Sequence, residues 1–417
     1  MSYDIVIVGA GPIGAYTAKL IAEKGFSVAI IEEHHEIGYP VHCAGLVSKR
    51  VIDITDAKRA VLKAFKSAKI HSKNRELFFE ASEPRAFAVD RAEFDRILIH
   101  QALNAGCELL LNAKALKAVR VNSNFSKKVN VEFLKDGRKN ILSCRILVGA
   151  DGASSFVSRA FGLSKPKEVI TGISAEIVNT NTAQEFVEIF VSSELAPEFF
   201  AWLIPVNEYA KIGLGTKTQT YEYFKKLLKL VKASKLISCN AGIIPLGLCK
   251  KTYDDSVMIV GDAACHVKPL SGGGLYTGLV SAQCCASTAV EALEADNYSK
   301  KLLHRYHKRW YSKIGKELKF GFIARTIFKN LTDGDFDRIL GSMNNARTIE
   351  LISKHGDLDY HSKLAKALAV RVPLHTLLFK SIAYLRCFVY TLYNITFGAY
   401  CNSIYSCKYC YYDNTLA

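Results

Sequence analysis

The feature that most constrains this chain is a glycine-rich turn close to its first residue. A β-branched apolar run at 4–8 precedes Gly9, Gly11 and Gly14, and a helical pattern continues to Lys24. Gly-x-Gly-x-x-Gly between a strand and a helix is typical of a turn that brings backbone N–H groups against a phosphate. We predict a βαβ unit in which the three glycines allow, in order, the tight turn, the approach of the phosphate and close helix packing.

An acidic residue ends the next predicted strand. The apolar run 27–31 leads into Glu32 and Glu33, and Glu32 lies 18 residues after the third glycine (32 − 14). A carboxylate here accepts hydrogen bonds from the ribose hydroxyls of a dinucleotide. Turn, helix and acid together predict dinucleotide binding by Glu32 and its neighbour Glu33, and an ordinary strand-to-helix turn is the alternative.

Two further acids follow apolar strands later in the chain. Asp151 and Gly152 come after the run 146–150, and Asp262 comes after 257–260. An aspartate at the carboxyl end of a strand can bind ribityl or ribose hydroxyls, whereas each acid taken singly could be a helix N-cap. A site for NAD alone requires neither segment, so their joint presence favours FAD.

A glycine-rich loop precedes the longest helical pattern of the chain. The loop 269–274 ends in Gly273 and Gly274, and the helical pattern then runs to Ala295. A helix N-terminus stabilises negative charge, which gathers at the N1 and O2 edge of a flavin on reduction. We predict that this loop holds the flavin ring system.

These segments together carry a family resemblance. They resemble p-hydroxybenzoate-hydroxylase-type flavoproteins, and within them the geranylgeranyl reductase family, on Gly9-x-Gly11-x-x-Gly14, Asp151-Gly152 and Gly261-Asp262. The resemblance covers about residues 1–330. It implies an α/β fold: a Rossmann-like FAD-binding domain of the p-hydroxybenzoate hydroxylase type, an antiparallel-sheet substrate domain and a helical C-terminal region.

The resemblance and the strand pattern divide the chain into three parts. We assign residues 1–167 and 256–298 to a discontinuous FAD-binding domain, 168–255 to the substrate-binding sheet, and 299–417 to the helical region. Alternating apolar residues predict strands in the middle part at Ile173 to Val178, Phe186 to Val191, Phe200 to Ile204 and Lys211 to Leu214.

Two short segments add cofactor and catalytic residues by resemblance. Segment 89–95 is similar to the family's Arg-x-x-Phe-Asp, which implies that Arg91 reaches the flavin nucleotide. Segment 39–48 is similar to the one that bears the family's active-site cysteine, which implies that Cys43 is catalytic and that Cys43 and Ala44 contact the cofactor. Many members read Cys-x-x-Gly, and this chain has Gly45 one position earlier.

A third segment implies a substrate wall. Residues 197–205 resemble the family's Tyr-x-Trp-x-Phe-Pro motif, so Phe200, Trp202 and Pro205 are expected to contact substrate. Phe200 replaces the usual tyrosine and Ile204 the usual phenylalanine, which makes the wall more apolar. Related flavin halogenases read Trp-x-Trp-x-Ile-Pro, and Phe200 fails the first tryptophan of that pattern.

The activity that this resemblance implies is FAD-dependent reduction of isoprenoid double bonds, by hydride from reduced flavin plus a proton, in lipid precursors such as digeranylgeranylglycerophospholipids. An isolated alkene accepts hydride only if a proton reaches its other carbon in a dry, ordered site. The Cys43 thiol is the candidate proton donor or redox relay, and His42 is the neighbouring alternative acid. The alternatives are a flavin-dependent monooxygenase of an apolar or aromatic substrate and a flavin-bearing adaptor without turnover.

Charge distribution suggests partners. The net charge is +16, and residues 300–329 hold ten Lys or Arg with Glu317 as the one acid. Apolar residues recur at helical spacing there, so we expect a basic amphipathic helix on an anionic membrane surface or, alternatively, a solvated helix face. We expect no nucleic-acid partner. The electron donor is either an acidic ferredoxin-like protein or NAD(P)H.

The cysteine pattern and the residues near both chain termini predict where the protein is located. Twelve cysteines without framework spacing, and no basic segment before the first apolar run, predict reduced thiols and no signal peptide, hence a cytoplasmic protein peripheral to the membrane. Residues 387–407 are uncharged, so an interfacial segment or a span is expected there. Cys401, Cys407 and Cys410 are expected to be free thiols, with a metal or a disulfide as alternatives. We predict no metal site.

Overall fold

The glycine-rich turn lies between strand β1 (Ser2–Val8) and helix α1 (Pro12–Ala22), at the centre of a large mixed sheet. The computed structural model describes residues 1–371 except 124–125, 164 and 179–183. The predictions for the uncharged stretch 387–407 and for the cysteines beyond residue 400 therefore fall outside the described residues.

The mixed sheet has eight strands in the order β17-β18-β11-β1-β2-β8, and β10 and β9 extend it from β11. β1 pairs in parallel with both β2 and β11, as the predicted βαβ unit requires. The further strands are β2 (Val28–Ile31), β8 (Glu108–Leu110), β9 (Ala113–Ser123), β10 (Ser126–Lys135), β11 (Arg138–Gly149), β17 (Tyr253–Asp254) and β18 (Val257–Ile259).

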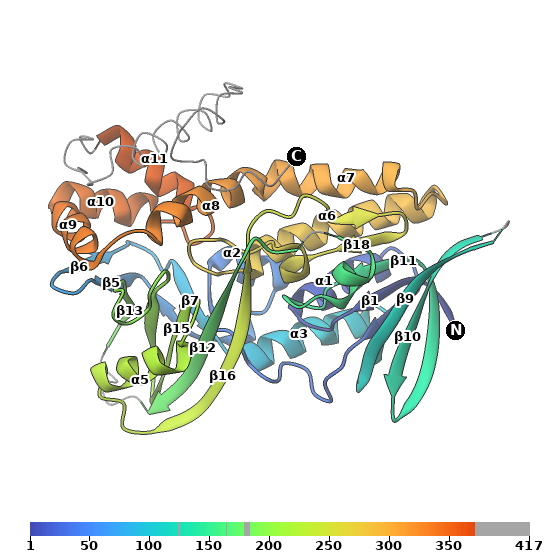
Figure 1. The fold of residues 1–417 in the computed structure, drawn as a ribbon, viewed down its shortest axis with the longest axis horizontal. Helices are drawn as coiled ribbons and strands as arrows, with labels where there is room; N and C mark the ends of the chain where they lie inside the picture. The colour runs from blue at the N-terminus through green and yellow to red at the C-terminus, as the bar shows by residue number, and fades with distance from the viewer. Residues whose placement is uncertain (124–125, 164, 179–183, 372–417) are drawn as a thin grey trace.

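Both faces of the parallel strands are buried, which explains their continuous apolar runs. Three helices, α1, α3 (Arg91–Asn104) and α6 (Leu275–Glu294), pack with one face in the largest apolar cluster, and strands β9 and β10 contribute to the cluster on the other face. Figure 1 shows α1, α3 and α6 layered beside β1 and β11. This is the predicted Rossmann-like half, including the predicted long helix after Gly274.

A second, seven-stranded sheet has the order β16-β12-β15-β14-β13-β5-β6. Its strands β12 to β15 lie where the sequence predicts strands, and helix α5 (Thr220–Leu230) packs on one face. The strands are β5 (Ser67–His71), β6 (Glu76–Glu80), β12 (Glu168–Val178), β13 (Phe186–Phe190), β14 (Ala201–Val206), β15 (Tyr209–Thr216) and β16 (Leu236–Leu246).

This sheet reaches beyond the range 168–255. β5 pairs in parallel with β13, so β5 and β6 come from a part of the chain that the sequence analysis assigned to the FAD-binding domain. The strand run at 168–255 is apolar enough to be recognised, whereas β5 carries Lys69 and His71 and gives no comparable pattern. The proposed domain limits stay a prediction, with this crossing as the point that they omit.

A small three-stranded sheet has the order β3-β7-β4, and in the chain β5 and β6 of the second sheet come between β4 and β7. It carries the segment after Cys43 and leads through β7 directly into α3. Its elements are β3 (Leu46–Val47), α2 (Lys49–Thr55), the 3-10 helix η1 (Lys58–Ala60), β4 (Val61–Phe65) and β7 (Ala86–Val89), and α4 (Phe156–Ala160) follows β11.

The C-terminal part described is helical, as predicted. Helix α7 (Lys300–Trp310), the π-helical turn η3 (Tyr311–Gly315) and α8 (Lys316–Phe328) follow one another and reach from α6 to the last helices (Figure 1). The last helices are α9 (Asp333–Met343), α10 (Ala346–His355) and α11 (His361–Arg371).

The apolar face of the basic helix is part of the protein core. Leu303, Tyr306, Trp310, Ile314 and Leu318 are each at most 1% exposed and belong to the cluster that α6 helps to form. The expectation that this face lies on lipid is therefore wrong: the helix period was read correctly, but the apolar stripe packs against α6. Of the helices in the described ranges, none combines the length and apolarity needed to cross a bilayer.

Candidate functional site

Close backbone contacts explain two of the three glycines of the first turn. Gly9 has φ +103°, and a Cβ there would lie 2.4 Å from the carbonyl oxygen of Ala150. A Cβ on Gly14 would lie 2.0 Å from the carbonyl oxygen of Gly9. A Cβ on Gly11 would meet nothing within 4 Å, so protein packing does not explain why this position is glycine. Close approach of a bound phosphate would explain it.

Glu32 lies beside this turn, where the sequence predicted it. Its carboxylate accepts a hydrogen bond from the Ala10 N–H at 2.8 Å and one from the His34 N–H at 3.0 Å. The acid is thereby fixed at the carboxyl edge of β2. Glu33 points elsewhere, because its carboxylate pairs with the exposed Lys114 at 2.9 Å.

Asp151 has protein partners for both carboxylate oxygens. It accepts hydrogen bonds from the Ser155 hydroxyl at 2.6 Å and from the Val157 N–H at 3.0 Å. Burial raises the pKa of Asp151, and these two bonds oppose that shift. The N-cap of α4 is Ser155, so Asp151 is not the cap residue, although its carboxylate binds that cap and the first turn of the helix. The role of Asp151 toward a cofactor, with that of Gly152, stays a prediction.

Asp262 differs from Asp151. It sits in the 3-10 turn η2 (Gly261–Ala264), and no donor among the described residues hydrogen-bonds its carboxylate. Burial raises the pKa of this group from 3.8 to about 6, with Arg91 opposing the shift. A Cβ on Gly274 would lie 2.7 Å from Asp262 Oδ1, so the acid faces the N-terminus of α6. A half-buried carboxylate that no donor in the described part of the chain binds fits a hydroxyl-bearing ligand.

The loop before α6 lies against side chains from the second sheet and from the segment before β14. A Cβ on Gly272 would lie 3.1 Å from the Phe199 ring and 3.3 Å from Ile244. A Cβ on Gly273 would lie 3.0 Å from the Lys268 side chain, whose Nζ pairs with Asp359 at 3.0 Å. Residues 272–274 thus form a tightly packed loop at the start of α6, which we call the glycine cradle, and the Phe199 ring lies next to it.

Arg91 and Cys43 lie together at the start of α3. The Arg91 guanidinium donates to Asp95 at 2.6 Å, while its buried Nε has no partner among the described residues. The two side chains line the same cavity. Burial alone would lower the pKa of Arg91, but Asp95 and then Cys43 raise it. Cys43 Sγ accepts the Gly45 N–H at 3.4 Å, and Ala44 packs against the apolar cluster under β14.

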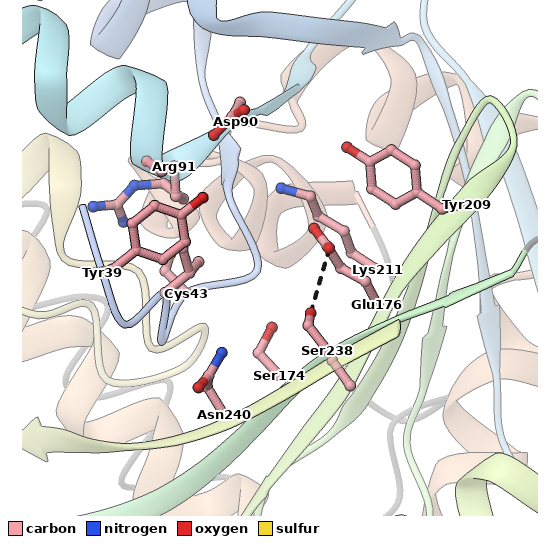
Figure 2. A pocket seen from close by; sticks show the side chains of 13 residues that line it. Tyr39, Cys43, Asp90, Arg91, Ser174, Glu176, Tyr209, Lys211, Ser238 and Asn240 are labelled. Carbon is pink, nitrogen blue, oxygen red and sulfur yellow. Dashed lines mark hydrogen bonds between the residues drawn. The ribbon is translucent and has the colours of Figure 1, made fainter. Parts of the chain in front are cut away.

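A cavity of about 420 Å³ opens beside this pair, and most of its polar lining was not predicted. Figure 2 shows Tyr39, Cys43 and Arg91 on one side and Glu176, Tyr209 and Lys211 on the other. The sheet also contributes Ser174, Ser238 and Asn240. The available signal was polar alternation within otherwise apolar strands, at 174 and 176 and at 238 and 240, and one lysine inside β15.

The substrate-wall residues lie on β14 and just before it. Phe200 stacks on Phe199 with ring centroids 4.5 Å apart and meets Trp202 edge-on at 5.9 Å. The Trp202 indole Nε1 is buried without a partner in the described part of the chain. Pro205 is buried further along β14, opposite Ala210. Phe200 thus continues the aromatic lining from the flavin loop, while Pro205 lies away from it.

Four features fit FAD: the Rossmann-like half, the glycine turn beside Glu32, the Asp262 carboxylate without a donor among the described residues, and the glycine loop at the start of α6. Together they define the class, a flavoprotein of the p-hydroxybenzoate hydroxylase type. The profile of the family described as FAD binding domain matches residues 2–222. The protein is 34% identical over 373 residues to an uncharacterized protein of Methanocaldococcus jannaschii, covering 87% of this chain and 94% of the relative.

Named relatives narrow the class. Digeranylgeranylglycerophospholipid reductase 2 of Methanopyrus kandleri is 31% identical over 373 residues, covering 84% of this chain and 93% of that protein. A solved geranylgeranyl bacteriochlorophyll reductase-like protein of Thermoplasma acidophilum has the same fold, with a TM-score of 0.79, 22% identity and coverage of 90% and 99%. The chain belongs to the geranylgeranyl reductase family of FAD-dependent oxidoreductases.

Proposed function

We propose that this protein reduces the double bonds of geranylgeranyl chains in membrane-lipid precursors such as digeranylgeranylglycerophospholipids. The names of its relatives support the substrate class. One observation carries the proposal for this chain: the loop at Gly272 lies against an apolar strip formed by Phe199 and Ile244, and Cys43 lines a cavity on the same sheet. An apolar chain on that strip would pass between the flavin loop and a thiol.

The chemistry divides between cofactor and protein. Bound FAD, once reduced, supplies the hydride for one alkene carbon. The protein must deliver a proton to the other carbon and exclude water while it does so. We assign the proton to the Cys43 thiol, and the positioning of the chain to Phe200 and Trp202. Pro205, buried further along β14, is given no contact with the chain. The electron donor, a ferredoxin-like protein or NAD(P)H, stays a prediction.

The cofactor residues keep the roles that the sequence suggests. Gly9, Gly11 and Gly14 would admit the pyrophosphate at the N-terminus of α1, and Glu32 would hold the adenosine ribose. Arg91 and Asp262 would bind the middle of the nucleotide, because the buried Arg91 Nε and the half-buried Asp262 carboxylate have no hydrogen-bond partner among the described residues. The cradle at Gly273 and Gly274 would receive the ring system.

We also propose that the basic face of α7 and α8 binds an anionic membrane surface, which makes the protein peripheral. Because the apolar face is buried, this contact would be electrostatic, at about 1 kcal/mol per basic side chain, and would weaken with salt. Vesicles with and without anionic lipid, sedimented at low and high salt, test it. The side chains available are the exposed Lys300, Lys301, Arg305, Lys308, Lys313, Lys316 and Lys319.

The reductase activity is tested by product mass. Enzyme, reductant and a digeranylgeranyl lipid are incubated without oxygen, and a gain of two hydrogens per reduced bond is expected. A product that gains oxygen, and only in air, would instead identify a monooxygenase. Bound flavin with no change in the lipid under either condition would identify an adaptor without turnover.

The role of Cys43 has its own test. Replacement of Cys43 by Ser keeps the size of the side chain but provides a much weaker acid. We expect normal flavin content and a loss of alkene reduction of about 100-fold or more, the usual contribution of general acid catalysis. Unchanged reduction would remove Cys43 from the mechanism and leave the reductase assignment intact.

A further inference from the structure

Lys211 is a buried cation in the middle of a strand. It is 4% exposed, and its neighbours Ala210 and Ile212 belong to the apolar cluster under α5. Its ammonium donates one hydrogen bond, at 2.7 Å, to the carbonyl oxygen of Val89. No carboxylate in the described ranges lies within ion-pair distance of it. A buried, incompletely paired charge is costly, so the position calls for a function.

Short contacts tie Lys211 to the cysteine segment. Val89, whose carbonyl Lys211 binds, donates its N–H to the Gly45 carbonyl at 2.8 Å. The Gly45 N–H in turn donates to Cys43 Sγ at 3.4 Å. A Cβ on Gly45, where φ is +70°, would lie 3.0 Å from the Lys211 ammonium. The lysine therefore reaches from the substrate sheet to within two residues of the thiol.

Lys211 and Cys43 line the same cavity. Its volume of about 420 Å³ is many times the ~30 Å³ that one water molecule occupies. Glu176 lies on the same wall as the lysine, with its carboxylate accepting the Ser238 hydroxyl at 3.3 Å (Figure 2). Burial lowers the pKa of Lys211, and Glu176 and Cys43 oppose that shift.

We propose that Lys211 returns a proton to Cys43 after each alkene reduction and that Glu176 connects Lys211 to solvent protons. The inference rests on the proposed function. In the reduction, the Cys43 S–H bond breaks, the alkene carbon gains the proton, and a thiolate is left. A Lys211 N–H bond then breaks as the S–H bond forms again, directly or through one water. The neutral amine takes its next proton from pocket water, and the Glu176 carboxylate on the same wall assists by accepting a proton from one water and passing it on through another.

The first turnover and later turnovers separate this role from a purely structural one. Enzyme with reduced flavin and no free reductant performs one reduction, for which Cys43 already holds its proton. In Lys211→Met this single flavin reoxidation should stay within about threefold of wild type, while steady-state turnover with continuous reductant falls about tenfold or more. Equal loss in both measurements would mean that Lys211 only anchors Val89, and would overturn the proposal.

Lys211→Arg separates the charge from the proton. Arginine keeps the positive charge but does not release its proton. Steady-state turnover should fall in this variant as in Lys211→Met. Full retention of turnover by Lys211→Arg would show that only the charge matters, and would overturn the relay. Glu176→Gln should give a smaller steady-state loss and an intact first turnover.

Alkylation of Cys43 gives a readout that needs no substrate. Iodoacetamide reacts with the thiolate, which nearby cations favour. At pH 7.5, Lys211→Met should lower the alkylation rate of the Cys43 peptide about threefold or more, and Lys211→Arg should preserve it within about twofold. An unchanged rate in Lys211→Met would overturn the proximity of the two groups. The charged and titratable groups facing this thiol are His42, Tyr39, Asp90, Arg91, Glu176, Tyr209 and Lys211.

These measurements fail separately from the proposed function. If the lipid is not reduced at all while the alkylation rates follow the order given, the reductase proposal fails and the Lys211 and Cys43 pair stands. If the lipid is reduced and neither the alkylation rates nor steady-state turnover depends on Lys211, the reductase proposal stands and the role of Lys211 fails. Flavin content and melting temperature of each variant establish that it is folded.

Discussion

Backbone atoms form the glycine turn between β1 and α1, whereas side chains from distant strands form the pocket wall on the second sheet. At the turn, Gly9 and Gly14 are fixed by carbonyl oxygens 2.4 and 2.0 Å from where a Cβ would be. On the sheet, Glu176 and Lys211 come from strands 35 positions apart (211 − 176) and meet only through the antiparallel pairing of β12 with β15. The two regions therefore respond differently to substitution.

The difference also concerns charge. Near the turn, Glu32 accepts hydrogen bonds from backbone N–H groups, and Asp262 has no hydrogen-bond donor within the described ranges. The sheet is instead joined to α8 by a buried ion pair, between Arg325 and Glu168 of β12, at 2.6 Å. We therefore expect the stability of the sheet region to depend on this ion pair. We expect the stability of the turn to depend on the absence of side chains at its glycines.

The largest effect is expected for Arg325→Met. Arg325 is 1% exposed and joins α8 to Glu168 and to the carbonyl oxygen of Glu198. Its removal leaves a partly buried carboxylate unpaired, which should cost about 3–5 kcal/mol in the free energy of unfolding. Denaturant unfolding measures it, with the exposed Lys319→Met as control at less than about 0.5 kcal/mol. A loss no larger than the control would show that ion pairs do not hold this sheet.

Next comes Gly14→Ala against Gly11→Ala. The Gly14 Cβ would collide with a backbone oxygen that cannot move freely, so we expect a loss of about 3 kcal/mol in stability. Gly11→Ala has space in the protein and should keep its stability, while its affinity for FAD falls about tenfold or more as the methyl group meets the phosphate. Thermal unfolding and flavin titration of both variants test this. Equal FAD affinity in Gly11→Ala and wild type would contradict the phosphate position.

Asp262→Asn should stabilise the flavin-free protein. Because burial raises the pKa of Asp262 to about 6, the folded state binds a proton that the unfolded chain releases near 3.8. Wild-type stability is therefore lost as pH rises from about 4 to 6, by about 1–3 kcal/mol in total. The variant should lack this loss, melt higher at pH 7 and bind FAD more weakly. Identical melting curves at pH 4 and 7 would contradict it.

The smallest effect is expected for Trp202→Phe. The indole N–H is buried without a partner among the described residues, so its removal relieves a cost of about 1 kcal/mol and offsets the lost apolar contact. Stability should change by less than about 1 kcal/mol, while KM for a geranylgeranyl lipid rises. Steady-state kinetics and melting temperature test both. A destabilisation well above that range would indicate that Trp202 is a core residue and does not contact substrate.

The sequence predicts well what depends on local backbone geometry. The turn at Gly9 to Gly14, the position of Glu32 and the helix after Gly274 are found as expected, because each follows from neighbours in the chain. The helix after Asp151 is capped by Ser155 and not by Asp151, and the acid instead binds that cap. These features need no knowledge of distant segments.

What the sequence misses depends on tertiary pairing. β5 enters the second sheet beside β13 across more than 100 positions of chain, and no local pattern encodes that partner. The basic helix shows an apolar stripe without saying that α6 covers it. Lys211 reads as a single polar residue in a strand, and only the contact with Val89 reveals that it points toward the cysteine segment.

The most direct test is anaerobic reoxidation of the flavin by lipid. The purified protein is saturated with FAD, reduced to the bleached form, freed of excess reductant and mixed with digeranylgeranyl lipid without oxygen. We predict that absorbance near 450 nm returns, with one flavin reoxidised for each double bond that gains two hydrogens. A flavin that stays reduced until air is admitted, with the lipid double bonds intact, would contradict the proposed reductase.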